Sequence, residues 1–125
     1  MENPESIEQS MDRLVSIINS YRLRFGTEAA LQNDLASILV LEHVEFEREF
    51  PIGTGRIDFY SEFRIGIECK VDGGPSEVAR QLLEYADHEL IDGLILVSRR
   101  NTHAMREETL RGKPFRYVWV GGSSL

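Results

Sequence analysis

The stretch GRIDFYSEFRIGIECKV, residues 55–71, places charged side chains inside segments that otherwise have the composition of buried β-strands. Apolar residues recur at every second position through most of it, which is the period of a strand with one buried face. Asp58, Glu68 and Lys70 stand at the alternate positions. Because an unpaired charge in a central strand is costly, these three residues need an explanation other than packing.

The second half of this stretch, residues 63–71, separates by parity into an apolar and a polar face. Glu68 and Lys70 share the polar face with Gly66, which lacks a side chain where a substrate backbone is expected to approach. The apolar face contains Phe63, Ile65, Ile67, Cys69 and Val71. Cys69 is therefore expected to be a buried structural thiol.

The first half of the stretch is expected to pair with the second as a hairpin. Ile57 and Phe59 are predicted on the core face, which leaves Asp58 on the opposite face. Asp58 then projects from the same side of the sheet as Glu68 and Lys70. Two carboxylates and an ammonium are predicted to converge near one end of the hairpin.

These groups are suited to phosphodiester hydrolysis. Hard divalent cations such as Mg²⁺ prefer oxygen ligands, usually one or two carboxylates completed by waters and substrate phosphate. Asp58 and Glu68 supply the carboxylates, and the backbone carbonyl of Cys69 can add a third oxygen. Lys70 is placed to orient or deprotonate a water, or to stabilise charge that builds on a phosphate.

The remaining sequence predicts one α/β domain over residues 1–125. An apolar stripe with helical spacing predicts an N-terminal helix with Asn3 as N-cap, Tyr21 in its stripe and a stop at Gly26. Thr27 is expected to cap a second helix with Leu31, Leu35, Ile38 and Leu39 in the core. The other predicted elements are strands over 44–52, 56–60 and 63–71, a helix over 76–90, a buried strand over 93–98, a short helix over 100–112 and a strand over 114–121.

The charge balance bears on possible partners. A net charge of −7 argues at first against a nucleic-acid ligand, because phosphate contacts depend on lysine and arginine. Binding depends on local patches, however, and all but two of the 14 basic residues are arginine, the better bidentate partner for phosphate. The acidic N-terminus is unlike a signal peptide, and no apolar run approaches the roughly 20 residues that cross a bilayer. We therefore expect a soluble cytoplasmic protein without membrane contact.

Asp58, followed after nine residues by Glu68-Cys69-Lys70, resembles the signature of the PD-(D/E)XK nuclease superfamily. The predicted αβββαβ order of residues 27–98 is similar to that family's core. Gln81-Leu82-Leu83-Glu84-Tyr85 resembles the Gln-x-x-x-Tyr motif of the RecB-like branch, and small Holliday-junction-resolvase-like and VRR-NUC-like domains are also similar. Ile57 stands where the family name implies proline.

The resemblance implies a restriction-endonuclease-like fold, with a mixed sheet flanked by helices in residues 27–121 and an extra N-terminal helix in residues 1–26. It implies a Mg²⁺-dependent endodeoxyribonuclease, with Mn²⁺ as a substitute, in which Asp58, Glu68 and Lys70 are catalytic. DNA is the expected partner. A homodimer is expected from the small size of the domain and its apolar N-terminal helix.

The resemblance also implies roles for three further residues, each with an alternative. Glu28 matches a helix residue that joins the family's metal site, but its place in a first helical turn is explained equally well by the helix dipole. Gln81 and Tyr85 would touch substrate or orient Lys70, yet Tyr85 lies in an apolar stripe and can be ordinary core. Trp119 is expected in the core or at an interface rather than as a platform for base stacking. The alternative function is a catalytically inactive module of the same fold that binds nucleic acid or a protein.

Overall fold

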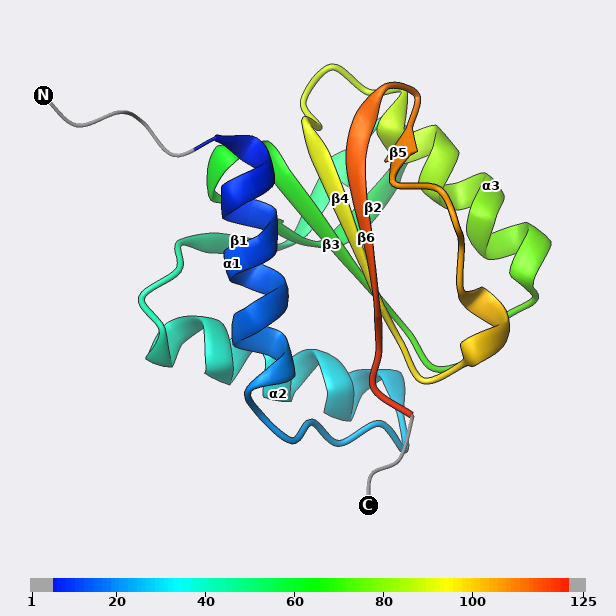
Figure 1. Cartoon of the computed structure of the whole chain (residues 1–125). Helices are drawn as coiled ribbons and strands as arrows, with labels where there is room; N and C mark the ends of the chain where they lie inside the picture. Colours follow the sequence, from blue (N-terminus) through cyan, green and yellow to red (C-terminus); the bar gives the residue numbers. More distant parts are fainter. Residues whose placement is uncertain (1–5, 122–125) are drawn as a thin grey trace, which may run out of the picture.

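The computed structural model of the chain describes residues 6–121, in which three helices and a six-stranded mixed sheet form three layers (Figure 1). Helices α1 and α2 pack on one face of the sheet, and α3 packs on the other. The helices are α1 (Ile7–Asn19), α2 (Glu28–Leu41) and α3 (Pro75–Ala86). The strands are β1 (Phe46–Ile52), β2 (Gly55–Ser61), β3 (Ile65–Lys70), β4 (Gly93–Ser98), β5 (Thr109–Leu110) and β6 (Lys113–Trp119). The predicted α/β class with a mixed sheet is confirmed.

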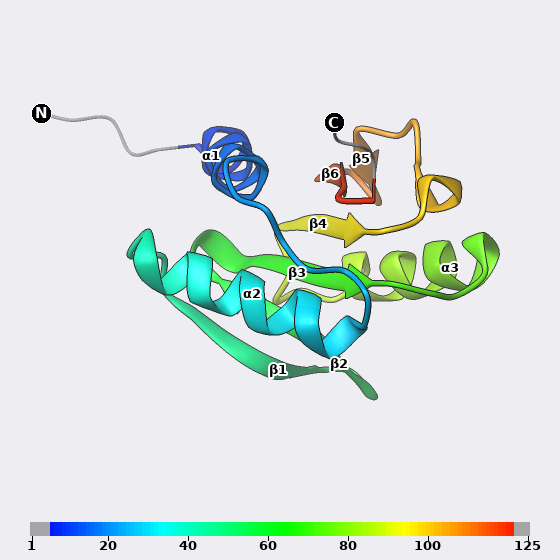
Figure 2. The same cartoon turned by 90° about the horizontal axis from the view of Figure 1, so that it is seen from below.

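The strands lie in the order β1-β2-β3-β4-β6-β5. Strands β1, β2 and β3 are antiparallel neighbours, β3, β4 and β6 are parallel, and β5 is antiparallel to β6. From α2 to β4 the elements follow the predicted order αβββαβ. Viewed from below, α1 lies beside β4 and β6, and α2 lies beside β3 (Figure 2). No helix among residues 6–121 is long and apolar enough to span a membrane.

Helix α1 is shorter than the sequence predicts. The expected N-cap, Asn3, lies outside the described residues, and Ser6 caps the helix through a reciprocal pair of hydrogen bonds with Gln9. The helix ends at Asn19, well before Gly26. Tyr21 is therefore not part of the apolar stripe; it is 37% exposed, and its hydroxyl donates to Glu42.

The apolar stripe of α1 is covered within the chain itself. Met11, Leu14 and Ile18 are fully buried in the cluster that α1 and α2 form with the sheet. This face is not available to a second subunit, so it does not support the expected homodimer. Helix α2 agrees with the prediction: the hydroxyl of Thr27 accepts from the N–H of Ala30, and all four predicted core residues are buried.

The hairpin of β2 and β3 departs from simple alternation in two places. Phe63 lies in a 3₁₀ turn (Glu62–Arg64) with φ of 61° and is 44% exposed, so it is not on the apolar face of β3. Phe59 packs on the α1/α2 side of the sheet, whereas Ile57 packs on the α3 side. The prediction that Ile57 and Phe59 share one face is therefore wrong, because regular strand pairing is interrupted at Asp58, which pairs with neither β1 nor β3 and lies opposite Glu49, where φ is 53°.

Residues 100–112 do not form the predicted helix. They contain a 3₁₀ turn (Asn101–His103), an irregular segment and the short strand β5. Arg111 and Gly112 have φ values of 53° and 78°, as a two-residue type I′ turn requires, and they connect β5 to β6. Strand β4 is buried at all six positions, as its continuous apolar run predicts.

Candidate active site

Strands β2 and β3 separate at the point where the predicted acidic residues lie. The ladder pairs Phe59 with Ile67 and ends there. Beyond it, the side chains of Asp58 and Glu68 replace the ladder. The N–H of Cys69 donates to Oδ2 of Asp58 at 2.8 Å, and the N–H of Asp58 donates to Oε1 of Glu68 at 3.1 Å. We call this arrangement of two carboxylates between two diverging strands the β2–β3 fork.

Lys70 completes the cluster. Its Nζ lies 3.3 Å from Oε2 of Glu68, whose side chain is only 3% exposed. The Lys70 side chain is 18% exposed, so its ammonium has limited access to solvent. The structure therefore brings Asp58, Glu68 and Lys70 together at the carboxyl end of β3.

Both carboxyl groups of the fork bind protons more tightly than ordinary carboxyl groups. Burial, and then the negative charge of Asp58, raises the pKa of Glu68 to about 8, despite the opposing charge of Lys70. Burial raises the pKa of Asp58 to about 6, against the effect of the hydrogen bond from Cys69. Additional positive charge at the fork would favour the ionised form of both groups.

The donor set of the fork suits a hard cation such as Mg²⁺, which is commonly held by one or two carboxylates with waters. The N–H of Cys69 points toward β2, and the carbonyl of a strand residue points to the same side as its N–H. The Cys69 carbonyl is thus expected on the β2 side of β3, and its role as a third oxygen ligand stays a prediction. The thiol of Cys69 is buried on the opposite side, in the α1/α2 cluster, and burial raises its pKa.

Glu28 is near the fork but does not complete a metal cage. Its Oε1 accepts from the N–H of Val71 at 3.4 Å, and its charge contributes to the raised pKa of Asp58. Among residues 6–121, no three His, Cys, Asp or Glu side chains are gathered closely enough to hold a metal ion. The carboxylates available to a metal here are Asp58 and Glu68, with Glu28 at the edge of the site.

Gln81 and Tyr85 bind each other rather than Lys70. Nε2 of Gln81 donates to the Tyr85 hydroxyl at 3.0 Å, and that hydroxyl donates to the carbonyl of Arg56 at 2.6 Å. The Tyr85 ring is buried in the α3-side core; burial, and then the negative charges of Glu68 and Asp58, raise its pKa. Tyr85 is thus a core residue that also ties α3 to the start of β2.

A pocket of about 350 Å³ opens between the end of β3 and α3. Lys70 and Gln81 contribute to its wall. This volume lies within the range of ligand pockets. The other lining residues are Asp72, Gly73, Glu77, Val78, Arg80 and Glu84.

Gly66 serves packing rather than substrate access. A Cβ added to it would lie 2.3 Å from Cδ1 of Ile57 and 3.1 Å from Cδ2 of Leu94. The prediction that a substrate backbone approaches Gly66 is therefore wrong, because core side chains fill the space beside its Cα.

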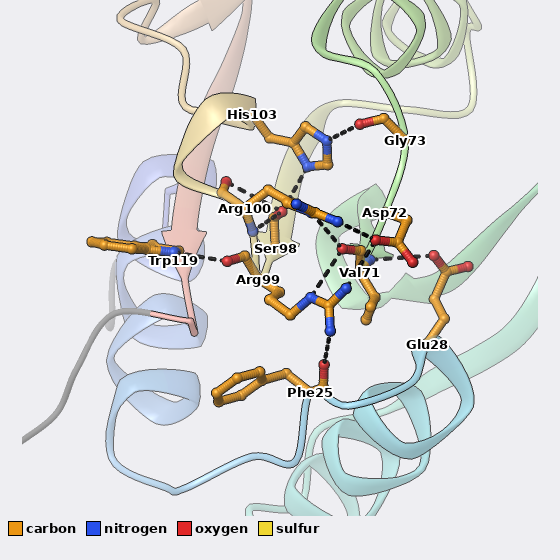
Figure 3. Close-up of polar contacts among 10 residues, drawn as sticks. All are labelled: Phe25, Glu28, Val71, Asp72, Gly73, Ser98, Arg99, Arg100, His103 and Trp119. Atoms are coloured by element: carbon orange, nitrogen blue, oxygen red, sulfur yellow. Dashed lines mark hydrogen bonds and ion pairs between the residues drawn. The ribbon is translucent and has the colours of Figure 1, made fainter.

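A polar network beside the fork was not predicted from the sequence (Figure 3). The Nε atoms of Arg99 and Arg100 both donate to the carbonyl of Val71, at 3.1 Å and 3.2 Å. Their Nη2 atoms lie 2.8 Å and 2.5 Å from Oδ1 of Asp72. The sequence did contain a signal for this network, because Arg99 and Arg100 directly follow the buried strand β4. Parallel strands bring their carboxyl ends to one edge of the sheet, so these arginines can be expected near the end of β3.

The fold and the site define a mixed α/β protein with one buried carboxylate, one half-buried carboxylate and a lysine at the fork between two strands of its sheet. Comparison with known protein families, with curated proteins and with solved structures finds no match for this chain.

Proposed function

We propose that this protein is a Mg²⁺-dependent nuclease with a PD-(D/E)XK-type site, which hydrolyses phosphodiester bonds of nucleic acid, with DNA as the expected substrate. The observation that carries the proposal is the β2–β3 fork, where the buried carboxylate of Glu68 and the half-buried carboxylate of Asp58 lie beside Lys70. The αβββαβ order of the elements from α2 to β4 supports it.

The fork is not explained by a contribution to the stability of the fold. Burial raises the pKa of both carboxyl groups, and the charge of Asp58 raises that of Glu68 further, so the fork destabilises the fold when both groups are charged. A divalent cation would offset that cost. Asp58 and Glu68 would hold Mg²⁺, with the carbonyl of Cys69 as a further oxygen ligand. When bound, the ion would polarise the scissile phosphate and acidify a nearby water.

Lys70 would act on the attacking water and on the phosphate. Its ammonium is held beside Glu68 and contributes to the wall of the 350 Å³ pocket, which would receive a substrate phosphate. From there it can orient the water for in-line attack on phosphorus and stabilise the negative charge that develops on the phosphoryl oxygens. Attack forms a new P–O bond while the bond to the leaving oxygen breaks.

The test is a cleavage assay with single-stranded, duplex, flapped and four-way DNA in the presence of Mg²⁺ or Mn²⁺. Lys70→Ala is expected to slow cleavage by about 10²- to 10⁴-fold. Lys113→Ala is the matched control, because Lys113 is the other lysine of the chain and donates to the carbonyl of His88, away from the fork. The proposal fails if the wild type cuts none of these substrates or if Lys70→Ala cuts as fast as Lys113→Ala.

A second candidate is a non-catalytic module that binds nucleic acid or a protein. The observations that favour it are the net charge of −7 and the lack of a three-residue metal group among residues 6–121. Calorimetric titration with Mn²⁺ separates the two functions. Binding to the wild type that is lost in Glu68→Gln supports the nuclease, whereas no binding to the wild type supports the module.

A further inference from the structure

The carboxyl ends of β3, β4 and β6 present aromatic and arginine side chains beside the candidate active site. The ladders pair Lys70 with Ser98, and Ser98 with Trp119. Since neighbouring strands lie about 4.8 Å apart, the Cα atoms of Lys70 and Trp119 are about 10 Å apart. We call Phe25, Arg99, Arg100 and Trp119 the Arg–Trp surface.

Trp119 is anchored at one edge and exposed elsewhere. Its Nε1 donates to the carbonyl of Arg99 at 2.9 Å, and the residue is 47% exposed. The neighbouring Val118, on the other face of β6, supplies the buried contact with the α1/α2 core. In Figure 3 the indole extends away from the rest of the network. An anchored, half-exposed indole is a preorganised platform for a planar ligand.

The arginines leave positive charge next to this platform. The guanidinium groups of Arg99 and Arg100 share the single carboxylate of Asp72, so one of the two positive charges is uncompensated within this trio. The Arg100 side chain is 49% exposed. Its Nε and Nη2 are engaged, whereas its Nη1 makes no hydrogen bond with the described residues and can donate to an anion.

Buried polar contacts hold these groups in place. His103 is 2% exposed; its Nδ1 lies 2.7 Å from the Ser98 hydroxyl, and its Nε2 lies 2.7 Å from the carbonyl of Gly73. The loop that carries the arginines is thereby tied to the loop that carries Asp72. Nη1 of Arg99 also donates to the carbonyl of Phe25. Phe25 as a residue is 38% exposed. The Arg–Trp surface is therefore ordered before any ligand arrives.

We propose that the Arg–Trp surface binds a single-stranded segment of the nucleic-acid substrate, with a base stacked on Trp119 and an adjacent phosphate paired with Arg100. This inference rests on the proposed function. Proteins hold single strands by combining aromatic platforms with basic groups that follow the backbone. In a duplex the base faces are covered by their own stack, so an open indole favours an unpaired strand. The pair of arginines and the closeness to Lys70 favour nucleic acid over a protein partner.

The single tryptophan of the chain makes the proposal directly measurable, because the indole emission comes from Trp119 alone. A short single-stranded DNA is titrated into the Lys70→Ala protein without added metal, so that cleavage is prevented. Indole quenching is recorded together with the anisotropy of a labelled strand. We expect the two curves to saturate together, and we expect a fully paired duplex of the same length to quench far less.

Two variants test the two contacts. Trp119→Ala is expected to weaken binding of the labelled strand by about 5- to 150-fold, the usual effect of losing one stacked base. Arg100→Ala is expected to make the dependence of log affinity on log salt shallower by about 0.7, the value for one phosphate contact to a single strand. Circular dichroism melting establishes that both variants are folded.

Phe63→Ala and Arg64→Ala are matched controls at the opposite end of β3. Phe63 is 44% exposed, and the Arg64 side chain is 46% exposed and paired with Asp92. Neither variant is expected to change affinity or salt dependence. A larger loss of binding in these variants than in Trp119→Ala and Arg100→Ala would refute the Arg–Trp surface.

The remaining outcomes separate this inference from the proposed function. Binding without indole quenching overturns the inference and leaves the nuclease proposal standing. Quenching by single strands with no cleavage by the wild type supports the Arg–Trp surface and overturns the nuclease proposal. A change in emission with protein concentration alone, together with a dimer in light scattering, assigns the surface to a second copy of the chain and overturns the inference.

Discussion

Replacing Glu68 with glutamine removes the charge from a buried carboxylate while keeping its shape. The glutamine carbonyl can still accept from the N–H of Asp58, so the fork retains this hydrogen bond. In the wild type, burial and the charge of Asp58 raise the pKa of Glu68 from 4.5 to about 8. At about 1.4 kcal/mol for each tenfold change in proton affinity, the full cost of ionising Glu68 in the folded protein is about 5 kcal/mol.

The sign of the pH dependence follows from the raised pKa. Below pH 4.5 Glu68 is protonated in both the folded and the unfolded protein, and no cost arises. As the pH rises from there to about 8, the unfolded protein releases the proton and the folded protein keeps it, so stability falls. Above about pH 8 the full cost of ionising Glu68 in the folded protein is present. The Glu68→Gln protein does not lose this stability as the pH rises. It keeps only the smaller loss of stability that comes from Asp58, whose pKa is raised to about 6.

The assay is urea unfolding in the presence of a chelator at a series of pH values from 4 to 9, roughly the window that these pKa values define. We expect Glu68→Gln to match the wild type near the acidic limit and to exceed it by several kcal/mol, at most about 5, near the alkaline limit. Glu84→Gln, at a side chain that is 64% exposed, is the control and should follow the wild type. Parallel curves for Glu68→Gln and the wild type would show that Glu68 is not buried beside Asp58 as described.

Three further predictions concern packing, the α3 contact and assembly. Gly66→Ala places a Cβ 2.3 Å from Cδ1 of Ile57 and should lower the free energy of unfolding, measured in urea, by about 1–3 kcal/mol. Gly26→Ala is the control and should lower it far less, because a Cβ there meets nothing within 4 Å. Equal values for the two variants would contradict the packing role of Gly66. Tyr85→Phe removes the hydroxyl that bonds the carbonyl of Arg56 and should lower the free energy of unfolding by about 0.5–1.5 kcal/mol. An unchanged midpoint in denaturant would show that this bond contributes nothing. A homodimer stays a prediction from the small size of the domain, and light scattering that finds a monomer at micromolar concentration would remove it.

Local patterns in the sequence predicted the elements whose structure depends on nearby residues. Helix α2 begins at its Thr27 cap, and its apolar stripe is buried as the helical period requires. The unbroken apolar run of β4 correctly indicated a strand covered on both faces. The spacing of Asp58, Glu68 and Lys70 in two adjacent strands was sufficient to predict that they meet, because a hairpin brings such positions together.

The errors arose where a distant partner decides the local structure. Alternation placed Ile57 and Phe59 on one face, but regular pairing with both β1 and β3 is interrupted at Asp58, and the two side chains enter different cores. The helix predicted over residues 100–112 gave way to β5, which gains an antiparallel partner in β6.

The sequence by itself determined the α/β class, the order of the elements from α2 to β4 and the three polar residues of the fork, because these depend on periodicity and short spacings. Only the tertiary structure decided how the carboxylates are held and what surrounds them. The Arg–Trp surface joins Phe25 to residues more than seventy positions away. Such a surface forms because parallel strands bring their carboxyl ends to one edge of the sheet, and no local pattern encodes that meeting.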